Sequence, residues 1–330
     1  MDPMERVQCV LAGRRPDRPP VGFWHHFPPD QVYGPSAVQA HLTHLQTYDL
    51  DFLKVMNDNG YPHATSVESV RDLAAIGDLH GDEPEFARQL DLLAALRAEL
   101  RGRVLMTTTV FSTWAVLRHL IRPPKEHLPP QMDGAADEPS RRIKDFYSQA
   151  PEALKSALRR IGTNLARFAR RCLAAGADGM FLSVRDDWVD APDSMASLYD
   201  ELVRPTELEI LAAASVGRFN MLHICGRPVN FRAFAEYPVH AINWADRLVG
   251  PAIDDAVRWA SPAICAGIDN LTTLVTGTPE ECEQQVADAL QQAGTRPILI
   301  APGCTYDPSR VPRANLEAVC RAVRRPCFSR

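Results

Sequence analysis

Short runs of β-type residues alternate with longer helical patterns along the whole chain, and this alternation restricts the possible folds more than any other feature. We identify eight such runs, at residues 20–27, 51–58, 104–113, 179–184, 219–226, 241–246, 263–270 and 297–304. Helical patterns lie between them, for example at residues 152–176 and 279–294. Strands that alternate with helices form parallel sheets, so the sequence predicts an α/β fold: a closed (β/α)8 TIM barrel with residues 1–330 in one domain. An open doubly wound sheet is the alternative, because strand counts from one sequence err by one or two.

One connection is much longer than the others. Residues 114–150 separate the third run from the next long helical pattern. Loops of this length are lids, binding loops or segments without fixed structure. Because this one follows a barrel strand, it would lie over the catalytic face. The sequence therefore predicts either a lid or a mobile insertion within the domain.

The charge balance and the cysteine pattern indicate the class of protein. The chain has 36 basic and 41 acidic residues, giving a formal net charge of −5, which argues against a nucleic-acid-binding protein. No apolar run is long enough to span a membrane, and residues 1–20 lack the apolar segment of a signal peptide. Eight scattered cysteines are typical of reduced thiols. We expect a cytoplasmic protein without nucleic-acid or membrane partners.

The ends of two runs carry the histidine and cysteines that zinc prefers. Alternation along a strand places His223 and Cys225 on the same side, and Cys304 follows the last run. Catalytic zinc sites use three protein ligands and keep a fourth position open; here Asp246, water or a substrate thiol would occupy it. Taken alone, the His-x-Cys pair also fits a core histidine beside a small apolar cysteine. Cys304 favours the metal interpretation, because both pieces lie on one barrel face.

The ligand types also indicate the chemistry. Two thiolates place much negative charge on a zinc ion, which makes the ion a poor activator of water. The same charge keeps a zinc-bound substrate thiolate nucleophilic. The set formed by His223, Cys225 and Cys304 therefore favours alkyl transfer to sulfur over hydrolysis.

Other polar residues at the ends of the runs are candidates for catalysis. Only one of His25 and His26 can face the barrel mouth, because neighbouring residues on a strand point to opposite sides. Asp58 stands where a strand turns into a loop, as a catalytic acid or as the cap of an Asx-turn.

Three further residues are candidates for binding a cofactor. Trp24 and Trp114 lie at or just beyond strand ends and would wall a pocket for a flat ligand, with Asn57 beside it. Packing in the core is the commoner role of a tryptophan.

The order of these motifs resembles the uroporphyrinogen decarboxylase superfamily. That group contains the decarboxylase and zinc-dependent methyl-corrinoid:thiol methyltransferases, all of them (β/α)8 barrels. The resemblance begins at "ERVQCVLAGRRPDRPPVGFW" and covers nearly the whole chain. Its most specific stretches are "CAGIDNLTTLVTGTPEECEQQVADAL" and "ILIAPGCTYDPSRVPRANLEAV".

The resemblance is closer to the methyltransferase branch. That branch is marked by His-x-Cys on the fifth strand and a cysteine after the eighth, which His223, Cys225 and Cys304 match. Asp246 stands where related zinc barrels of the methionine synthase kind draw a further acid. The resemblance implies zinc, a small thiol substrate and a methyl group carried on a corrinoid. The corrinoid would belong to a separate partner protein, since this chain shows no corrinoid-binding sequence of its own.

Two other functions remain open. The decarboxylase uses arginines after its first strand, where this chain reads "FWHHFPPD", and a histidine where Cys304 stands. Asp58 does match its acid after the second strand, so metal-free decarboxylation of a tetrapyrrole is one alternative. A diverged zinc barrel that acts on another small thiol or metabolite is the other. Either a monomer or a homodimer fits the resemblance.

Overall fold

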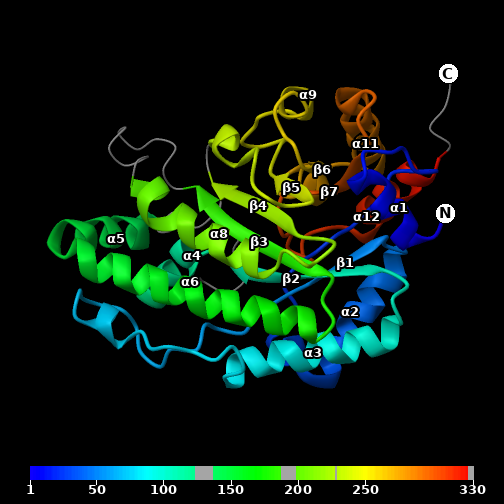
Figure 1. Ribbon diagram of the computed structural model, residues 1–330. Coiled ribbons are helices and arrows are strands. Elements are labelled where there is room, and N and C mark those ends of the chain that lie inside the picture. Colours follow the sequence, from blue (N-terminus) through cyan, green and yellow to red (C-terminus); the bar gives the residue numbers. More distant parts are fainter. Residues whose placement is uncertain (123–136, 187–197, 227–228, 326–330) are drawn as a thin grey trace.

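A curled parallel sheet forms the centre of the protein. The computed structural model describes residues 1–122, 137–186, 198–226 and 229–325 (Figure 1). Its seven strands are β1 (Phe52–Val55), β2 (Leu105–Phe111), β3 (Gly179–Asp186), β4 (Met221–Gly226), β5 (Ala241–Trp244), β6 (Ala263–Ile268) and β7 (Ile298–Pro302). They are hydrogen-bonded in chain order, and every neighbouring pair is parallel. Seven of the eight predicted runs are therefore strands of a fold consistent with a TIM-like barrel.

The first predicted strand, residues 20–27, is not a regular strand, and this part of the prediction is corrected. The segment forms only isolated parallel bridges, from Val21 to Ile300 and from His25 to Tyr306. Prolines at positions 19, 20 and 28 surround it, and proline has no N–H to donate to a ladder.

The segment nevertheless contacts both edges of the sheet. The N–H of Ile300, in β7, donates to the carbonyl of Pro20 at 2.8 Å, and the N–H of Asp51, just before β1, donates to the carbonyl of Val21 at 2.9 Å. Together with the bond from the N–H of Gly22 to the carbonyl of Ile300, these make three backbone hydrogen bonds, so the segment takes the place between β7 and β1 without a full ladder.

Helices surround the strands (Figure 1). The longer ones are α1 (Pro3–Leu11), α2 (Gly34–Tyr48), α3 (Pro84–Leu100), α4 (Thr113–Ile121), α5 (Asp137–Gln149), α6 (Pro151–Ala174), α8 (Arg204–Ala213), α11 (Pro279–Ala293) and α12 (Arg313–Arg324). Short helical turns are η1 (Pro29–Gln31), η2 (Asp72–Ala75), η4 (Tyr199–Val203), η5 (Phe231–Phe234), α9 (Ile253–Ala256) and α10 (Thr273–Thr276). The two helical patterns of the sequence correspond to α6 and α11. A capping box between Thr278 and Glu281 starts α11, and Gly294 ends it at a φ of 61°.

The long connection at residues 114–150 is helical at both of its ends. Helix α4 begins after Ser112, whose side chain caps it by accepting from the N–H of Ala115, and α5 covers much of the second half. Residues 123–136 lie outside the described part of the chain. The expectation of a continuous loop is therefore corrected for its described parts, because their apolar residues bury a helix face.

The apolar side chains form two buried groups. The larger one lies between the sheet and the helices. The smaller one fills the barrel interior, and it includes Trp24, Phe52, Met56, Leu105, Phe181, Met221, Cys265 and Leu299. Val7 and Val10 of α1 join the interior group and close the end of the barrel at which the strands begin. The opposite end, where the strands finish, carries the candidate site.

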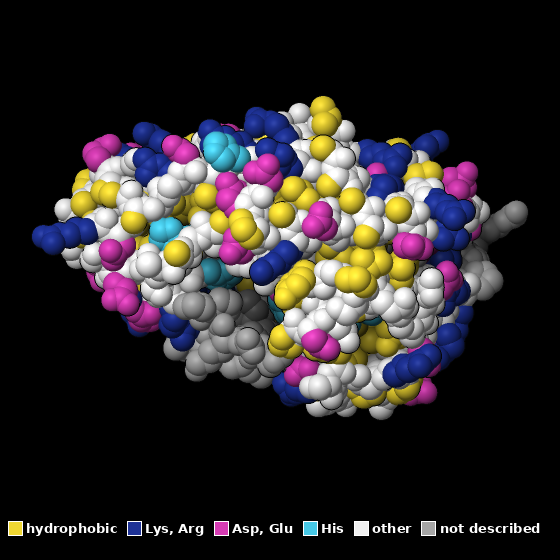
Figure 2. All heavy atoms as spheres, turned by 90° about the horizontal axis from the view of Figure 1, so that it is seen from below, with side chains coloured by type: hydrophobic (Ala, Val, Ile, Leu, Met, Phe, Trp, Pro, Cys, Tyr) yellow, Lys and Arg dark blue, Asp and Glu magenta, His cyan; other side chains and the backbone are white. Residues whose placement is uncertain are grey.

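Figure 2 shows basic and acidic side chains mixed over the face seen from below, with hydrophobic side chains between them. Among the described residues, no helix is both long enough and apolar enough to cross a membrane.

Candidate metal centre

Three predicted ligands meet at the end of the barrel where the strands finish. His223 and Cys225 belong to β4, and Cys304 lies in the turn that follows β7. The candidate ligand atoms of the three residues all lie within 4.8 Å of one another. The residues are 4%, 7% and 6% exposed, respectively. The curled sheet thus brings β4 and the end of β7 together, as the sequence predicts.

Hydrogen bonds fix the tautomer of the neutral His223 ring. The amide nitrogen of Asn243 donates to the carbonyls of Cys265 (2.7 Å) and Pro302 (3.1 Å), so its Oδ1 must be the atom that faces His223. An amide oxygen only accepts, so the Nδ1 of His223 carries the proton and donates at 2.6 Å. In the neutral ring, Nε2 then has a free electron pair. This is the arrangement that metal-binding histidines use.

The spacing of two of these atoms matches that of neighbouring zinc ligands. The Sγ of Cys304 lies 3.5 Å from the Nε2 of His223. Zinc–sulfur and zinc–nitrogen bonds at a tetrahedral angle put the two ligand atoms about 3.6 Å apart. Imidazole nitrogen and cysteine sulfur are also the ligand types that zinc prefers. The group of His223, Cys225 and Cys304 is therefore compatible with zinc.

A glycine positions Cys304 in this group. A Cβ atom at Gly303 would lie 2.5 Å from the Cα of Ala245, closer than real contacts allow. The N–H of Gly303 donates to the carbonyl of Ile268 at 3.0 Å. The turn after β7 therefore packs directly on the backbone that follows β5, and it holds Cys304 facing β4.

Asp246, the predicted fourth ligand, is not part of the group of ligand atoms. Its carboxylate accepts from the N–H of Gly267 at 3.1 Å and pairs with Arg247 at 3.3 Å. Burial is the main cause that raises the pKa of this carboxyl to about 6. Its contacts hold the side chain at the edge of β6 rather than among the three other residues.

The residues predicted for catalysis lie near the end of the segment at residues 20–27 and just after β1. The Nδ1 of His26 lies 2.7 Å from Oδ1 of Asp58, and both side chains contact solvent. His25 is largely enclosed by aromatic neighbours, with the ring centroids of Phe27 and Tyr306 at 4.5 and 5.3 Å. Burial lowers the pKa of His25.

The three residues predicted to bind a cofactor separate in the structure. Asn57 is buried and donates to the carbonyl of Thr109 at 3.2 Å. Trp24 lies in the barrel interior, with its ring centroid 5.4 Å from that of Phe181. Trp114 belongs to the apolar core between sheet and helices, and it is 1% exposed. The alternative given for the tryptophans, packing in a core, thus describes both Trp24 and Trp114.

Two residues beside the candidate metal centre, Phe181 and Lys54, were not predicted from the sequence. The Phe181 ring stacks on His223 at a centroid distance of 5.4 Å and an interplanar angle of 23°. Lys54 is 5% exposed in the middle of β1, and burial lowers its pKa to about 8. The sequence does contain a signal for Lys54, because a lysine within the largely apolar run "DFLKVM" indicates a buried charge.

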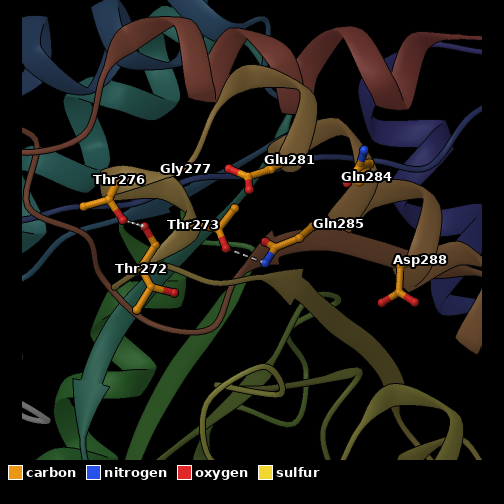
Figure 3. Close-up of a pocket in the computed structure, with 8 residues that line it drawn as sticks. All are labelled: Thr272, Thr273, Thr276, Gly277, Glu281, Gln284, Gln285 and Asp288. Atoms are coloured by element: carbon orange, nitrogen blue, oxygen red, sulfur yellow. Dashed lines mark hydrogen bonds between the residues drawn. The ribbon is translucent and has the colours of Figure 1, made fainter.

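A separate hollow lies on the outside of the barrel. Figure 3 shows it lined by eight residues of α10, α11 and their flanks, including Thr273, Gln285 and Asp288. The side chain of Gln285 donates to the hydroxyl of Thr273 at 2.8 Å, so its polar groups bond one another. None of its lining residues belongs to the candidate metal centre.

Comparison with known proteins identifies the family and the fold. The model of the family "Uroporphyrinogen decarboxylase (URO-D)" matches residues 24–326. A methyltransferase from Methanosarcina mazei superimposes with a TM-score of 0.70 at 16% identity, over 98% of each chain. No curated protein matches the chain.

Two other solved structures match less well. The B12-independent methionine synthase from Shewanella sp. W3-18-1 has a TM-score of 0.43 at 13% identity, over 71% of this chain and 66% of that one. The homocysteine methyltransferase from Escherichia coli has 0.39 at 16%, over 88% and 86%.

Proposed function

This chain belongs to the uroporphyrinogen decarboxylase family, and within it we propose that the protein is a zinc-dependent enzyme that transfers a methyl group to the sulfur of a small thiol. The observation that carries the proposal is the group of His223, Cys225 and Cys304, with ligand atoms within 4.8 Å. The methyltransferase from Methanosarcina mazei, whose fold this chain shares over 98% of its length, supports it.

The side chains prepare a site for one metal ion and one thiol. Asn243 holds the His223 ring so that Nε2 faces Cys304, and the burial of all three ligands excludes most water. A zinc ion held there would bind the sulfur of the thiol and lower its pKa, so that it is a thiolate at neutral pH. Structural zinc sites are normally closed by four protein ligands. The described residues provide three, which leaves one position for the substrate.

The methyl donor in this proposal is a corrinoid on a separate protein that docks where the strands finish. His26 and Asp58 lie at this end of the barrel with side chains that contact solvent, and they would contact the thiol or the donor. His25, enclosed by Phe27 and Tyr306, would contribute from the wall of the site. Trp24 and Asn57 would support the pocket from inside. Helices α4 and α5 would act as the lid.

Metal analysis of matched variants tests the proposal. We expect about one zinc per chain in protein purified without chelators. Cys304→Ala should lose most of this zinc and the methylation of a thiol by methylcobalamin. The control is Cys282→Ala, which removes a buried cysteine of α11 and should keep both. Zinc that is absent from the unaltered protein, or equally present in both variants, would refute the proposal. So would full methylation activity after chelation.

A further inference from the structure

Lys54 places a positive charge inside the barrel, close to the candidate metal centre. Its Nζ lies 4.4 Å from the centroid of the Phe181 ring and 5.7 Å from that of Trp24. The same Phe181 ring stacks on His223. Lys54 therefore points along the interior toward the end of the barrel that holds His223 and Cys304.

The ammonium group has no strong partner in the described part of the chain. Its hydrogen bond goes to the Sδ of Met56 at 3.1 Å, and a thioether is a weak acceptor. Asp58 acts on it only from a distance, and that carboxylate is already paired with His26. Buried charges are normally paired or fully hydrogen-bonded, because removing them from water is costly. The other contacts of the ammonium group are with the rings of Phe181 and Trp24, and none of these partners carries a negative charge. A buried ammonium group without a close anionic partner among the described residues therefore points to a ligand that supplies one.

Two buried hydroxyl groups on the neighbouring strand also have no partner. Thr107 is the register neighbour of Lys54, and Thr109 is that of Phe181, so both side chains share the interior face with them. They are 0% and 3% exposed, and the Oγ1 atom of each lacks a hydrogen bond among the described residues. Buried hydroxyls are normally hydrogen-bonded. Three unsatisfied groups, all able to donate, thus gather on β1 and β2.

We propose that Lys54, Thr107 and Thr109 form a subsite for an oxyanion, which holds the negatively charged end of the thiol substrate. Ammonium and hydroxyl donors bind carboxylate and similar oxygen anions through charge-assisted hydrogen bonds. The identity of the ligand as a thiol rests on the proposed function. The subsite itself needs no metal, because none of its three residues belongs to the zinc ligand group.

Binding of two thiols that differ in charge tests the subsite. The probes are 3-mercaptopropionate and 3-mercaptopropan-1-ol, measured by calorimetry on zinc-loaded protein. The unaltered protein should prefer the anion by roughly tenfold or more, the usual effect of one charged hydrogen bond. Lys54→Met keeps the length of the side chain and should abolish the preference, while the affinity for the alcohol changes less than about twofold. Thr109→Val should reduce the preference by roughly threefold.

Thermal unfolding separates a binding role from a structural one. Without ligand, Lys54→Met should unfold at the same temperature or higher, because it removes an unpaired buried charge. Propionate should raise the unfolding temperature of the chelator-treated, unaltered protein but not that of Lys54→Met. A lower unfolding temperature in Lys54→Met, with the preference for the anion retained, would overturn the subsite.

The outcomes distinguish the subsite from the proposed function. If the protein purified without chelators contains no zinc but is still stabilised by propionate, the subsite is supported and the zinc mechanism is refuted. Zinc binding with equal affinity for both thiols would overturn the subsite and leave the mechanism standing. If Lys54→Met does not fold, the Thr109→Val variant provides the test, because valine keeps the shape of threonine. An unchanged preference for 3-mercaptopropionate in Thr109→Val would overturn the proposal.

Discussion

The Nδ1 atom of His223 donates to the Oδ1 of Asn243 at 2.6 Å, and this bond leaves Nε2 free to bind a metal ion. Asn243→Leu should therefore lower the affinity for zinc by about tenfold to a hundredfold, the usual effect of losing such a support. Competition with a chromogenic chelator measures the affinity.

Loss of another buried asparagine provides the control for this variant. Asn164 in α6 donates to the hydroxyl of Tyr61 and to the carbonyl of Gly77, away from the three ligands. Asn164→Leu should destabilise the fold without changing the affinity of the folded protein for zinc. Equal zinc affinity in the two variants would show that Asn243 does not support His223.

The sequence was sufficient to predict the sheet, because each strand carries its own local signal. Apolar runs between helical patterns located β1 to β7 within a few residues, and parallel order follows from the alternation itself. The segment at residues 20–27 has the same composition, yet it does not become a regular strand. The difference depends on missing N–H groups at its prolines and on contacts with two distant strands, which composition does not reveal.

The clustering of His223, Cys225 and Cys304 was predictable for a different reason. Alternation fixes His223 and Cys225 on one side of a strand, and barrel topology places Cys304 at the same end. The support around them was not predictable. The contacts of Asn243 depend on the register between β4, β5 and β6, and the orientation of Asp246 depends on Gly267 and Arg247.

Gly303→Ala should disturb Cys304 through the backbone. The added Cβ would lie 2.5 Å from the Cα and 2.9 Å from the Cβ of Ala245. We expect a loss of about 1–3 kcal/mol in the free energy of unfolding, as for other overpacked sites, together with weaker zinc binding. Urea denaturation and metal analysis measure the two effects.

A glycine in open space is the control for this substitution. At Gly60, an added Cβ meets no atom within 4 Å. Gly60→Ala should therefore change neither stability nor zinc binding appreciably. If Gly303→Ala behaves in the same way, the close approach to Ala245 does not position Cys304.

Asp51→Asn should weaken the closure of the barrel. Asp51 is fully buried and accepts from Arg6 at 2.7 Å, from Arg18 at 2.6 Å and from the N–H of Val21 at 2.9 Å. Removing one charge from a buried ionic group costs about 3–5 kcal/mol, because the remaining charges lose their partner. We expect a loss of this size in the free energy of unfolding, measured with urea.

Asp17 offers the matched exposed position. It also pairs with Arg6, at 2.7 Å, but its side chain is 45% exposed. Asp17→Asn should cost at most about 1 kcal/mol, since solvent screens exposed ion pairs. A similar loss in both variants would argue against a special role of the buried carboxylate in holding residues 18–21 beside β1.

Acid should destabilise the protein through His41 and His44. Burial lowers the pKa of His41 to about 4 and that of His44 to about 3, below the value of about 6.5 expected in the unfolded chain. Below pH 6.5 the unfolded state thus binds more protons, so the free energy of unfolding falls as the pH drops toward about 4. Each histidine contributes at most about 1.4 kcal/mol per pH unit.

The His44→Phe variant tests this contribution. It removes the hydrogen bond to the carbonyl of Phe23, so the free energy of unfolding at pH 7.5 should be lower. Its decline with acid should be shallower by the contribution of one histidine. Urea denaturation at several pH values between 7.5 and 4.5 measures both slopes, and parallel slopes would show that His44 takes no part in the acid response.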